Sequence, residues 1–184
     1  MTAPTANAPG SIGGVGAADS GRAANGHGEA DPLRGTWQLV RWEIAYGDGR
    51  PPTLPFGEGA SGLIHYTADG HMSACIARAG RQPLSSESVR SAPVEERLAA
   101  FESYFQYAGP YELRRGPHLP TGVQVVHHVT MSLNPNFVGT DQVRNVAFDA
   151  AGVLTLSASD TVPGSAVARH HRLVWRRAVP AASR

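Results

Sequence analysis

His127, Gln142 and Arg144 are the residues of this 184-residue sequence whose types and spacing could do chemistry. They belong to two segments, 123–134 and 141–149, in which apolar and polar residues alternate on either side of an Asn-Pro-Asn turn. Successive side chains of an extended strand point to opposite faces. His127 falls on the apolar face of the first segment, and Gln142 and Arg144 share one face of the second. The alternation therefore predicts that all three side chains point into the protein.

An arginine among apolar side chains needs a partner, because an uncompensated charge away from water is very costly. The nearest acidic residues, Asp141 and Asp149, fall on the opposite face of their segment. We therefore expect a hydrated or ligand-filled cavity beside Arg144 rather than a dry core. A second interpretation stays open, in which His127 and Arg144 are hydrogen-bonding residues of the core.

Acid–base chemistry fits these side-chain types. Burial beside Arg144 favours neutral His127, and a neutral imidazole can take a proton next to a carbonyl group. Arg144 would stabilise a developing enolate or a carboxylate, and Gln142 would orient a carbonyl. Tyr66 joins them as an expected catalytic residue at the edge of the cavity. The side chains expected to bind the substrate are Met72, Ile76, Tyr107, Tyr111, Val125, Val129, Phe148, His171 and Trp175.

Short alternating segments separated by turns must hold these residues in place. One of the turns, Asp69-Gly70, has the sequence of a hairpin. About eight to ten strands in an antiparallel meander are expected. Closure into a barrel would remove the sheet edges and leave room for one small ligand, and a two-sheet sandwich is the alternative. The segments expected to be strands cover residues 36–46, 61–78, 109–115, 121–133, 140–159 and 168–178.

Residues 92–109 break this alternation. Apolar residues recur at helical spacing from Val94 to Phe105, through Leu98 and Phe101. Pro93 suits the first turn of a helix, and Gly109 suits its end. The pattern predicts one amphipathic helix inserted between strands.

The composition of the sequence indicates where the folded domain begins and ends, and which classes of partner are excluded. Residues 1–31 are mostly small and polar, so we expect a disordered tail, then one barrel domain over 32–179 and a loose C-terminus over 180–184. The 16 Lys and Arg balance 15 Asp and Glu, which gives no electrostatic footprint for nucleic acid or a membrane surface. No segment resembles a membrane span or a secretory signal. A cytoplasmic protein is expected.

The sequence lacks the residue patterns of disulfides, metal sites, serine hydrolases and nucleotide-cofactor sites. Cys75 is the only cysteine, so no intramolecular disulfide forms. The adjacent pairs His127-His128 and His170-His171 point to opposite faces of a strand, so neither pair chelates one ion. The sequence contains no Gly-x-Ser-x-Gly elbow and no dinucleotide fingerprint. We expect neither a metal nor a cofactor.

Several segments resemble a known family. "GTWQLV" at residues 35–40 and "WRR" at residues 175–177 resemble the opening and closing strands of lipocalins and related calycin barrels. "PFGEGASGLIHYTADGHMSACIAR", "AAFESYFQYAGPYEL" and "HHVTMSLNPNFVGTDQVRNVAFD" resemble the bacterial and fungal lipocalin-like domain family, over about residues 33–178. The resemblance implies a closed antiparallel barrel with an internal pocket. It also implies that Trp37 lies at the closed end of the barrel beside Arg176 or Arg177.

The resemblance extends to function. Some lipocalin-like barrels of natural-product pathways resemble cyclases or isomerases that fold a polyketide-type substrate without a cofactor. We therefore expect this protein to bind a small, mostly apolar metabolite as a cofactor-independent cyclase or isomerase of polyketide- or terpenoid-type metabolism. The alternative is a non-catalytic carrier or sensor. The polar positions implied are His127, Gln142 and Arg144, and the aromatic ones are Tyr66, Tyr107 and Tyr111. The sequence leaves the oligomeric state open.

Deletion of residues 1–31 should leave the melting temperature nearly unchanged, because this segment lacks the residues that build a core. Thermal unfolding of the full and shortened chains measures the difference. A loss of several degrees would show that the segment packs on the barrel.

Overall fold

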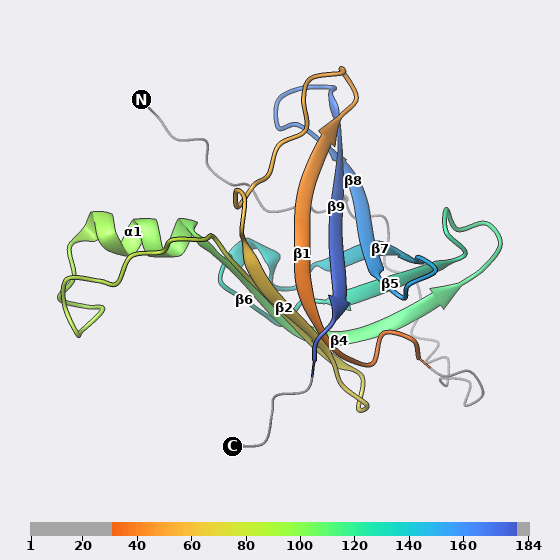
Figure 1. Ribbon diagram of the computed structural model, residues 1–184, viewed down its shortest axis with the longest axis horizontal. Coiled ribbons are helices and arrows are strands. Elements are labelled where there is room, and N and C mark those ends of the chain that lie inside the picture. Colours follow the sequence, from red (N-terminus) through yellow and green to blue (C-terminus); the bar gives the residue numbers. More distant parts are fainter. Residues whose placement is uncertain (1–30, 180–184) are drawn as a thin grey trace.

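Nine antiparallel strands, one α-helix and one short 3-10 helix make up residues 31–179, the part of the chain that the computed structural model describes (Figure 1). The strands are β1 (Gly35–Tyr46), β2 (Ser61–Tyr66), β3 (His71–Ala77), β4 (Tyr104–Arg115), β5 (Val123–His128), β6 (Met131–Ser132), β7 (Asp141–Phe148), β8 (Leu154–Thr161) and β9 (Ala168–Arg177). The helix α1 covers Val94–Glu102, and the 3-10 helix η1 covers Pro135–Phe137.

The strands form one closed sheet. Their order is β3-β2-β1-β9-β8-β7-β5-β4-β6, and an additional pairing of β3 with β4 closes the ring. Eight strands therefore make the barrel, and the short β6 adds to β4. The predicted antiparallel barrel is confirmed, and the sandwich alternative is wrong. Closure leaves no long unpaired edge, and alternate side chains of each strand fill the interior.

A bulge in β1 changes which residues face inward. The register with β9 shifts between Leu39 and Arg41, and Val40 between them is exposed. Before the bulge the odd residue Trp37 is buried, and after it the even residues Trp42 and Ile44 are buried. Because Val40 is left out of the pairing with β9, the even-numbered Trp42 faces into the barrel.

The predicted helix over 92–109 is wrong in extent. It ends at Glu102, and Tyr104, Phe105 and Tyr107 belong to β4, where they pair with β3. Alternating aromatic residues suit a strand, and pairing with β3 overrides their helical spacing. Gly109 lies within β4, where a Cβ atom would overlap the carbonyl of His128. This glycine allows a close backbone approach and does not end a helix.

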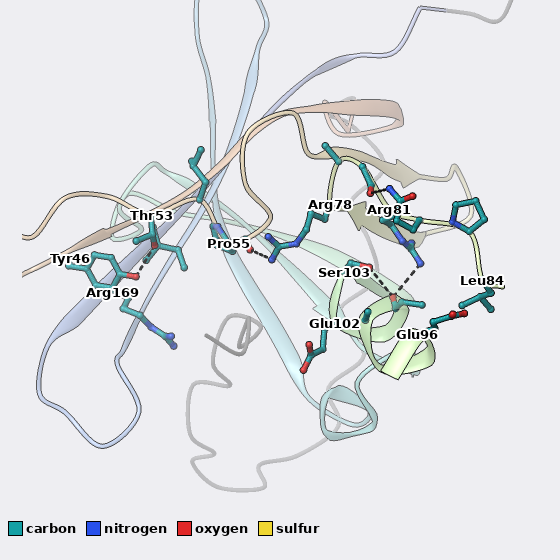
Figure 2. A pocket seen from close by; sticks show the side chains of 18 residues that line it. Tyr46, Thr53, Pro55, Arg78, Arg81, Leu84, Glu96, Glu102, Ser103 and Arg169 are labelled. Atoms are coloured by element: carbon teal, nitrogen blue, oxygen red, sulfur yellow. Dashed lines mark hydrogen bonds between the residues drawn. The ribbon is translucent and has the colours of Figure 1, made fainter. Parts of the chain in front are cut away.

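The apolar face expected of the helix is not packed on the core. Val94, Leu98 and Phe101 are all exposed. In Figure 1 α1 lies to one side of the strands, and Glu96 binds it to the preceding loop by accepting hydrogen bonds from Ser85. A groove separates this helix and loop from the barrel rim (Figure 2).

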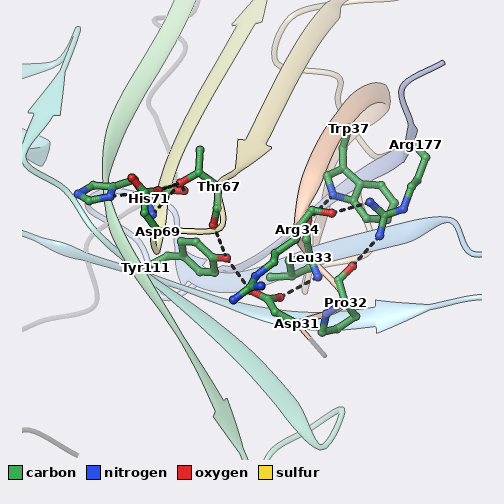
Figure 3. A network of polar contacts seen from close by, with 10 residues as sticks. All are labelled: Asp31, Pro32, Leu33, Arg34, Trp37, Thr67, Asp69, His71, Tyr111 and Arg177. Atoms are coloured by element: carbon green, nitrogen blue, oxygen red, sulfur yellow. Dashed lines mark hydrogen bonds and ion pairs between the residues drawn. The ribbon is translucent and has the colours of Figure 1, made fainter. Parts of the chain in front are cut away.

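The other end of the barrel is closed by the chain that precedes β1 (Figure 3). The indole of Trp37 is buried and donates to the carbonyl of Leu33 at 2.7 Å. The guanidinium of Arg177 lies 4.2 Å from the Trp37 ring centroid and donates to the carbonyls of Arg34 and Pro32. The expected placement of Trp37 beside Arg177 is confirmed.

Residues 1–30 of the predicted tail (1–31) and the predicted C-terminus (180–184) lie outside the described residues. Asp31, which the sequence assigns to the tail, accepts hydrogen bonds from the Leu33 amide and the Tyr111 hydroxyl. This residue therefore connects the start of the barrel chain to β4.

Replacing Arg177 should loosen the closed end. Arg177→Gln removes the cation from the Trp37 ring and two charge-assisted hydrogen bonds to carbonyls. We expect a loss of about 1–2 kcal/mol in the free energy of unfolding, measured by urea denaturation. Arg176→Gln, on the neighbouring exposed position, is the control and should change stability little. Equal losses in the two variants would contradict this account of the cap.

Candidate functional site

His127 is held inside the barrel by two tyrosines. It comes from β5 and is fully buried. Its Nε2 lies 2.9 Å from the hydroxyl of Tyr66 on β2, and its Nδ1 lies 2.8 Å from the hydroxyl of Tyr107 on β4. Both ring nitrogens are therefore engaged by protein groups, and the imidazole has no open edge toward a ligand.

This cluster is uncharged near neutral pH. Burial, reinforced by the positive charge of Arg144, holds the pKa of His127 well below its usual range. Burial also raises the pKa values of Tyr66 and Tyr107. A neutral imidazole has one donor and one acceptor nitrogen, so one tyrosine donates to His127 and the other accepts from it. The accepting tyrosine keeps its own hydroxyl proton for a further partner.

Arg144 on β7 is buried without an acidic partner. Its Nη1 donates to the carbonyl of Val143 at 2.8 Å, and its Nη2 donates to Oε1 of Gln142 at 3.1 Å. Gln142 is fixed in turn by donating to the hydroxyl of Thr140. Among residues 31–179 no carboxylate forms an ion pair with this guanidinium. Neutral carbonyl acceptors alone stabilise the buried cation, so the site favours the approach of an electron-rich group.

A void of about 20 Å³ lies beside Arg144, which is room for about one water molecule. Trp42 and Trp175 line it, and neither indole N–H has a hydrogen-bond partner in the described part of the chain. Tyr107 is also in its wall, whereas His127 reaches it only through that tyrosine. The lining consists of Trp42, Ile64, Ala74, Ile76, Phe105, Tyr107, Arg144, Leu156, Leu173 and Trp175.

A second polar cluster lies toward the opposite end of the barrel from Trp37. Asp160 on β8 accepts two hydrogen bonds from Arg169 of β9, at 2.8 and 2.6 Å. Asp160 also lies 3.3 Å from Nε2 of His171. Because a carboxylate only accepts, Nε2 carries the proton and the buried Nδ1 is an acceptor without a partner among the described residues. Burial lowers the pKa of His171, although Asp160 opposes the shift.

The structure gathers part of the predicted site. Tyr66 and Tyr107 both contact His127, and Gln142 contacts Arg144, so Gln142 orients the arginine. The wall of the void contains Ile76, Tyr107, Arg144 and Trp175 from the predicted set. Met72, Val125 and Val129 are buried in the core but do not line the void, Tyr111 lies at the closed end, and His171 belongs to the second cluster.

Phe148 does not lie where the alternation placed it. It is 40% exposed, at the end of β7, with its ring 5.9 Å from that of Trp37. The inward alternation of β7 stops at Val146, because Phe148 has passed the closed end of the barrel. It is therefore removed from the residues expected to bind a substrate in the interior.

Sequence reasoning misses Trp42 and Phe105 in the wall of the void, and the pair of Arg169 with Asp160 in the second cluster. Trp42 is inward only because of the bulge at Val40, which strict alternation does not reveal. Phe105 was assigned to the helix. Arg169 shares the parity of His171, so the same alternation could have found it, but nothing in the sequence pairs it with Asp160.

A closed antiparallel barrel with a polar cluster in an apolar interior defines a calycin-type protein, a class suited to small hydrophobic ligands. The chain belongs to the lipocalin-like domain family, whose match covers residues 34–178. No curated protein matches the chain in sequence. Within the described residues, no helix is long and apolar enough to cross a membrane. In that same range no three His, Cys, Asp or Glu side chains gather in positions to hold a metal ion.

Stability should fall as the pH drops below about 6.5, the pKa of a histidine in the unfolded chain. The folded pKa values of His127 and His171 are lower, so the unfolded state binds protons that the folded state does not. Each histidine contributes a loss of up to about 1.4 kcal/mol per pH unit. Urea unfolding at pH 7.5, 6.5 and 5.5 measures the slope.

Two variants identify the source of this slope. His127→Gln and His171→Gln should each reduce it by removing one buried imidazole whose pKa is lowered in the folded protein. Constant stability between pH 7.5 and 5.5 would show that the buried histidines accept protons as readily as free ones.

Proposed function

We propose that the protein binds a small, mostly apolar metabolite with an oxygen-bearing end at Arg144, and isomerises or cyclises it without a cofactor. One observation carries this proposal. A buried cation without an ion-pair partner among residues 31–179 stands beside Tyr107 at a void whose other walls are apolar or aromatic. Such a wall attracts a carbonyl or carboxylate oxygen and otherwise prefers an apolar body.

Arg144 and Tyr107 would supply electrostatic catalysis. When a hydroxyl group of the substrate adds to the carbonyl carbon of the same molecule, a C–O bond forms as the C=O π bond breaks, and negative charge develops on the carbonyl oxygen before that oxygen takes the hydroxyl proton. Fixed donors in a dry site stabilise this charge. Arg144 supplies a permanent positive charge. Tyr107 supplies a hydroxyl proton when Nδ1 of His127 donates to it and Tyr66 donates to Nε2. Isomerisation and cyclisation keep every atom of the substrate, so the reaction needs no oxidant, reductant or co-reactant.

His127 takes a different role in this proposal from the one its type suggests. Since both of its nitrogens bind tyrosines, it does not take a proton from the substrate directly. It acts as a positioning residue that sets the direction of the Tyr107 hydroxyl.

A carrier or sensor is the second candidate, and the same engagement of His127 favours it, because the void has no free base in its wall. Tyr107→Phe separates the two. A catalyst would lose turnover while it still bound its ligand, whereas a carrier would have no turnover to lose. Native mass spectrometry of the purified protein identifies a co-purifying small molecule for both measurements.

Arg144→Gln is the direct test of the proposed site. The variant removes the cation and keeps much of the shape, so turnover should fall about 10²–10³-fold. Affinity for an oxygen-bearing ligand should fall about 10–100-fold, because a hydrogen bond to a charged group contributes about 1.5–3 kcal/mol. Stability should change little or rise, since an underpaired charge disappears. Arg176→Gln is the matched control. A variant that loses about 3–5 kcal/mol of stability with no separable loss of binding would make Arg144 a core residue.

A further inference from the structure

We infer that the groove beside helix α1 holds the apolar body of the ligand, and that the indole N–H groups of Trp42 and Trp175 bind its oxygen inside the barrel. This inference rests on the proposed function, because it takes the same interior void as the end of the site. It adds the place of the body, the residues that recognise the oxygen, and the class of ligand.

The groove has the size of a ligand site. Its volume is about 690 Å³, whereas pockets for small molecules hold about 300–1,000 Å³. One wall comes from the barrel rim, with Ile44, Leu54 and Pro55, and the other from α1 and the loop before it, with Leu84 and Ala99 (Figure 2). Five charged side chains also line the groove: Arg78, Arg81, Glu96, Glu102 and Arg169. The interior void alone, at about 20 Å³, is too small for anything but one polar group.

The groove and the void are neighbours along β1. Trp42 lines the void, and Ile44, the next residue on the same face, lines the groove. Phe56 stands between them. Its ring is buried and stacks on Trp42 with centroids 5.2 Å apart, while Leu54 and Pro55 just before it line the groove. Displacing this one ring would join the two spaces.

The two indoles specify what enters the void. Trp42 is 4% exposed and Trp175 is 1% exposed, and neither N–H has a partner among residues 31–179. The indole of Trp37, by contrast, donates to the carbonyl of Leu33. A buried donor without a hydrogen-bond acceptor costs about 1–3 kcal/mol of stability. Indole N–H and guanidinium groups only donate, so their common partner is an acceptor.

The class of ligand follows from the groove and from the two indole N–H groups at the void. It is an apolar molecule long enough to fill the groove, with a terminal carbonyl or carboxylate oxygen that replaces the water for which the void has room. Arg144 in the same wall adds a charge that favours the carboxylate. Decanoic acid and 2-undecanone share the apolar chain and differ in that end group, so they serve as the two probes.

The three tryptophans of the chain provide the readout. Each gives one indole N–H signal in a ¹⁵N–¹H NMR spectrum, and the signal moves downfield when the group donates a hydrogen bond. On addition of a probe, the Trp42 and Trp175 signals should move, while the Trp37 signal, already bonded to Leu33, should remain. Trp42→Phe and Trp175→Phe assign the signals and should each weaken binding about 3–10-fold by removing one donor.

A pair of variants on α1 tests the groove. Ala99 is exposed and lines it, so Ala99→Phe should fill the space and weaken both probes at least about tenfold. Leu98, the preceding residue, is exposed and not in the groove wall, so Leu98→Phe is the control and should bind normally.

The outcomes separate this inference from the proposed function. If decanoic acid and 2-undecanone both fail to bind the wild-type protein, the inference is overturned, whereas the proposed function is decided by the effect of Arg144→Gln on the co-purified ligand. If the probes bind and Arg144→Gln weakens them, but Ala99→Phe does not or the Trp42 and Trp175 signals stay still, only the inference is overturned. Tighter binding of decanoic acid identifies a carboxylate ligand, and equal binding of the two probes identifies a carbonyl ligand; both support the inference.

Discussion

The pairing of β3 with β4 is the constraint on which the rest of the structure depends. Residues His71–Ala77 and Tyr104–Pro110 form an unbroken antiparallel register, and without it the sheet would be open. The pairing turns alternating faces into an inside and an outside, so Phe105 and Tyr107 become interior residues. It also forces residues 78–103 to leave the barrel as a loop and a helix, and this excursion forms the outer wall of the groove.

Inside the barrel, one fixed positive charge acts on a set of neutral polar groups. Burial depresses the pKa of His127, and the charge of Arg144 acts in the same direction, so the imidazole stays neutral. For Tyr66 and Tyr107 burial dominates over Arg144, and both hydroxyls keep their protons. The protons of the cluster therefore stay in place near neutral pH, and the electric field of the site comes from the guanidinium of Arg144.

Alternation in the sequence predicted the barrel and most of its interior. His127, Gln142, Arg144, His171 and Trp175 are buried as expected, because one face of each strand meets the core wherever the ladder is regular. The errors arise where local pattern and tertiary pairing disagree. The helical spacing through Phe105 was overridden by β3, and Phe148 ran past the end of the barrel. Tyr66 and Tyr107 lie on strands far from His127 in the sequence. The sequence therefore predicts that all three side chains line one interior, but it does not predict that the two tyrosines bind His127.

The bulge at Val40 determines which alternate residues of β1 face the core. Upstream of it odd residues face the core, and downstream even residues do. The register with β9 passes from Leu39 directly to Arg41, so loss of Val40 would restore a regular ladder with Trp42 and Ile44 still inward. Loss of a paired residue such as Glu43 would instead turn Ile44 outward and Ala45 inward. An insertion in the loop after Tyr46 carries no such penalty, because a loop has no faces to exchange. Length variation is therefore tolerable at Val40 and in the loop after Tyr46, and severe at the paired residues between them.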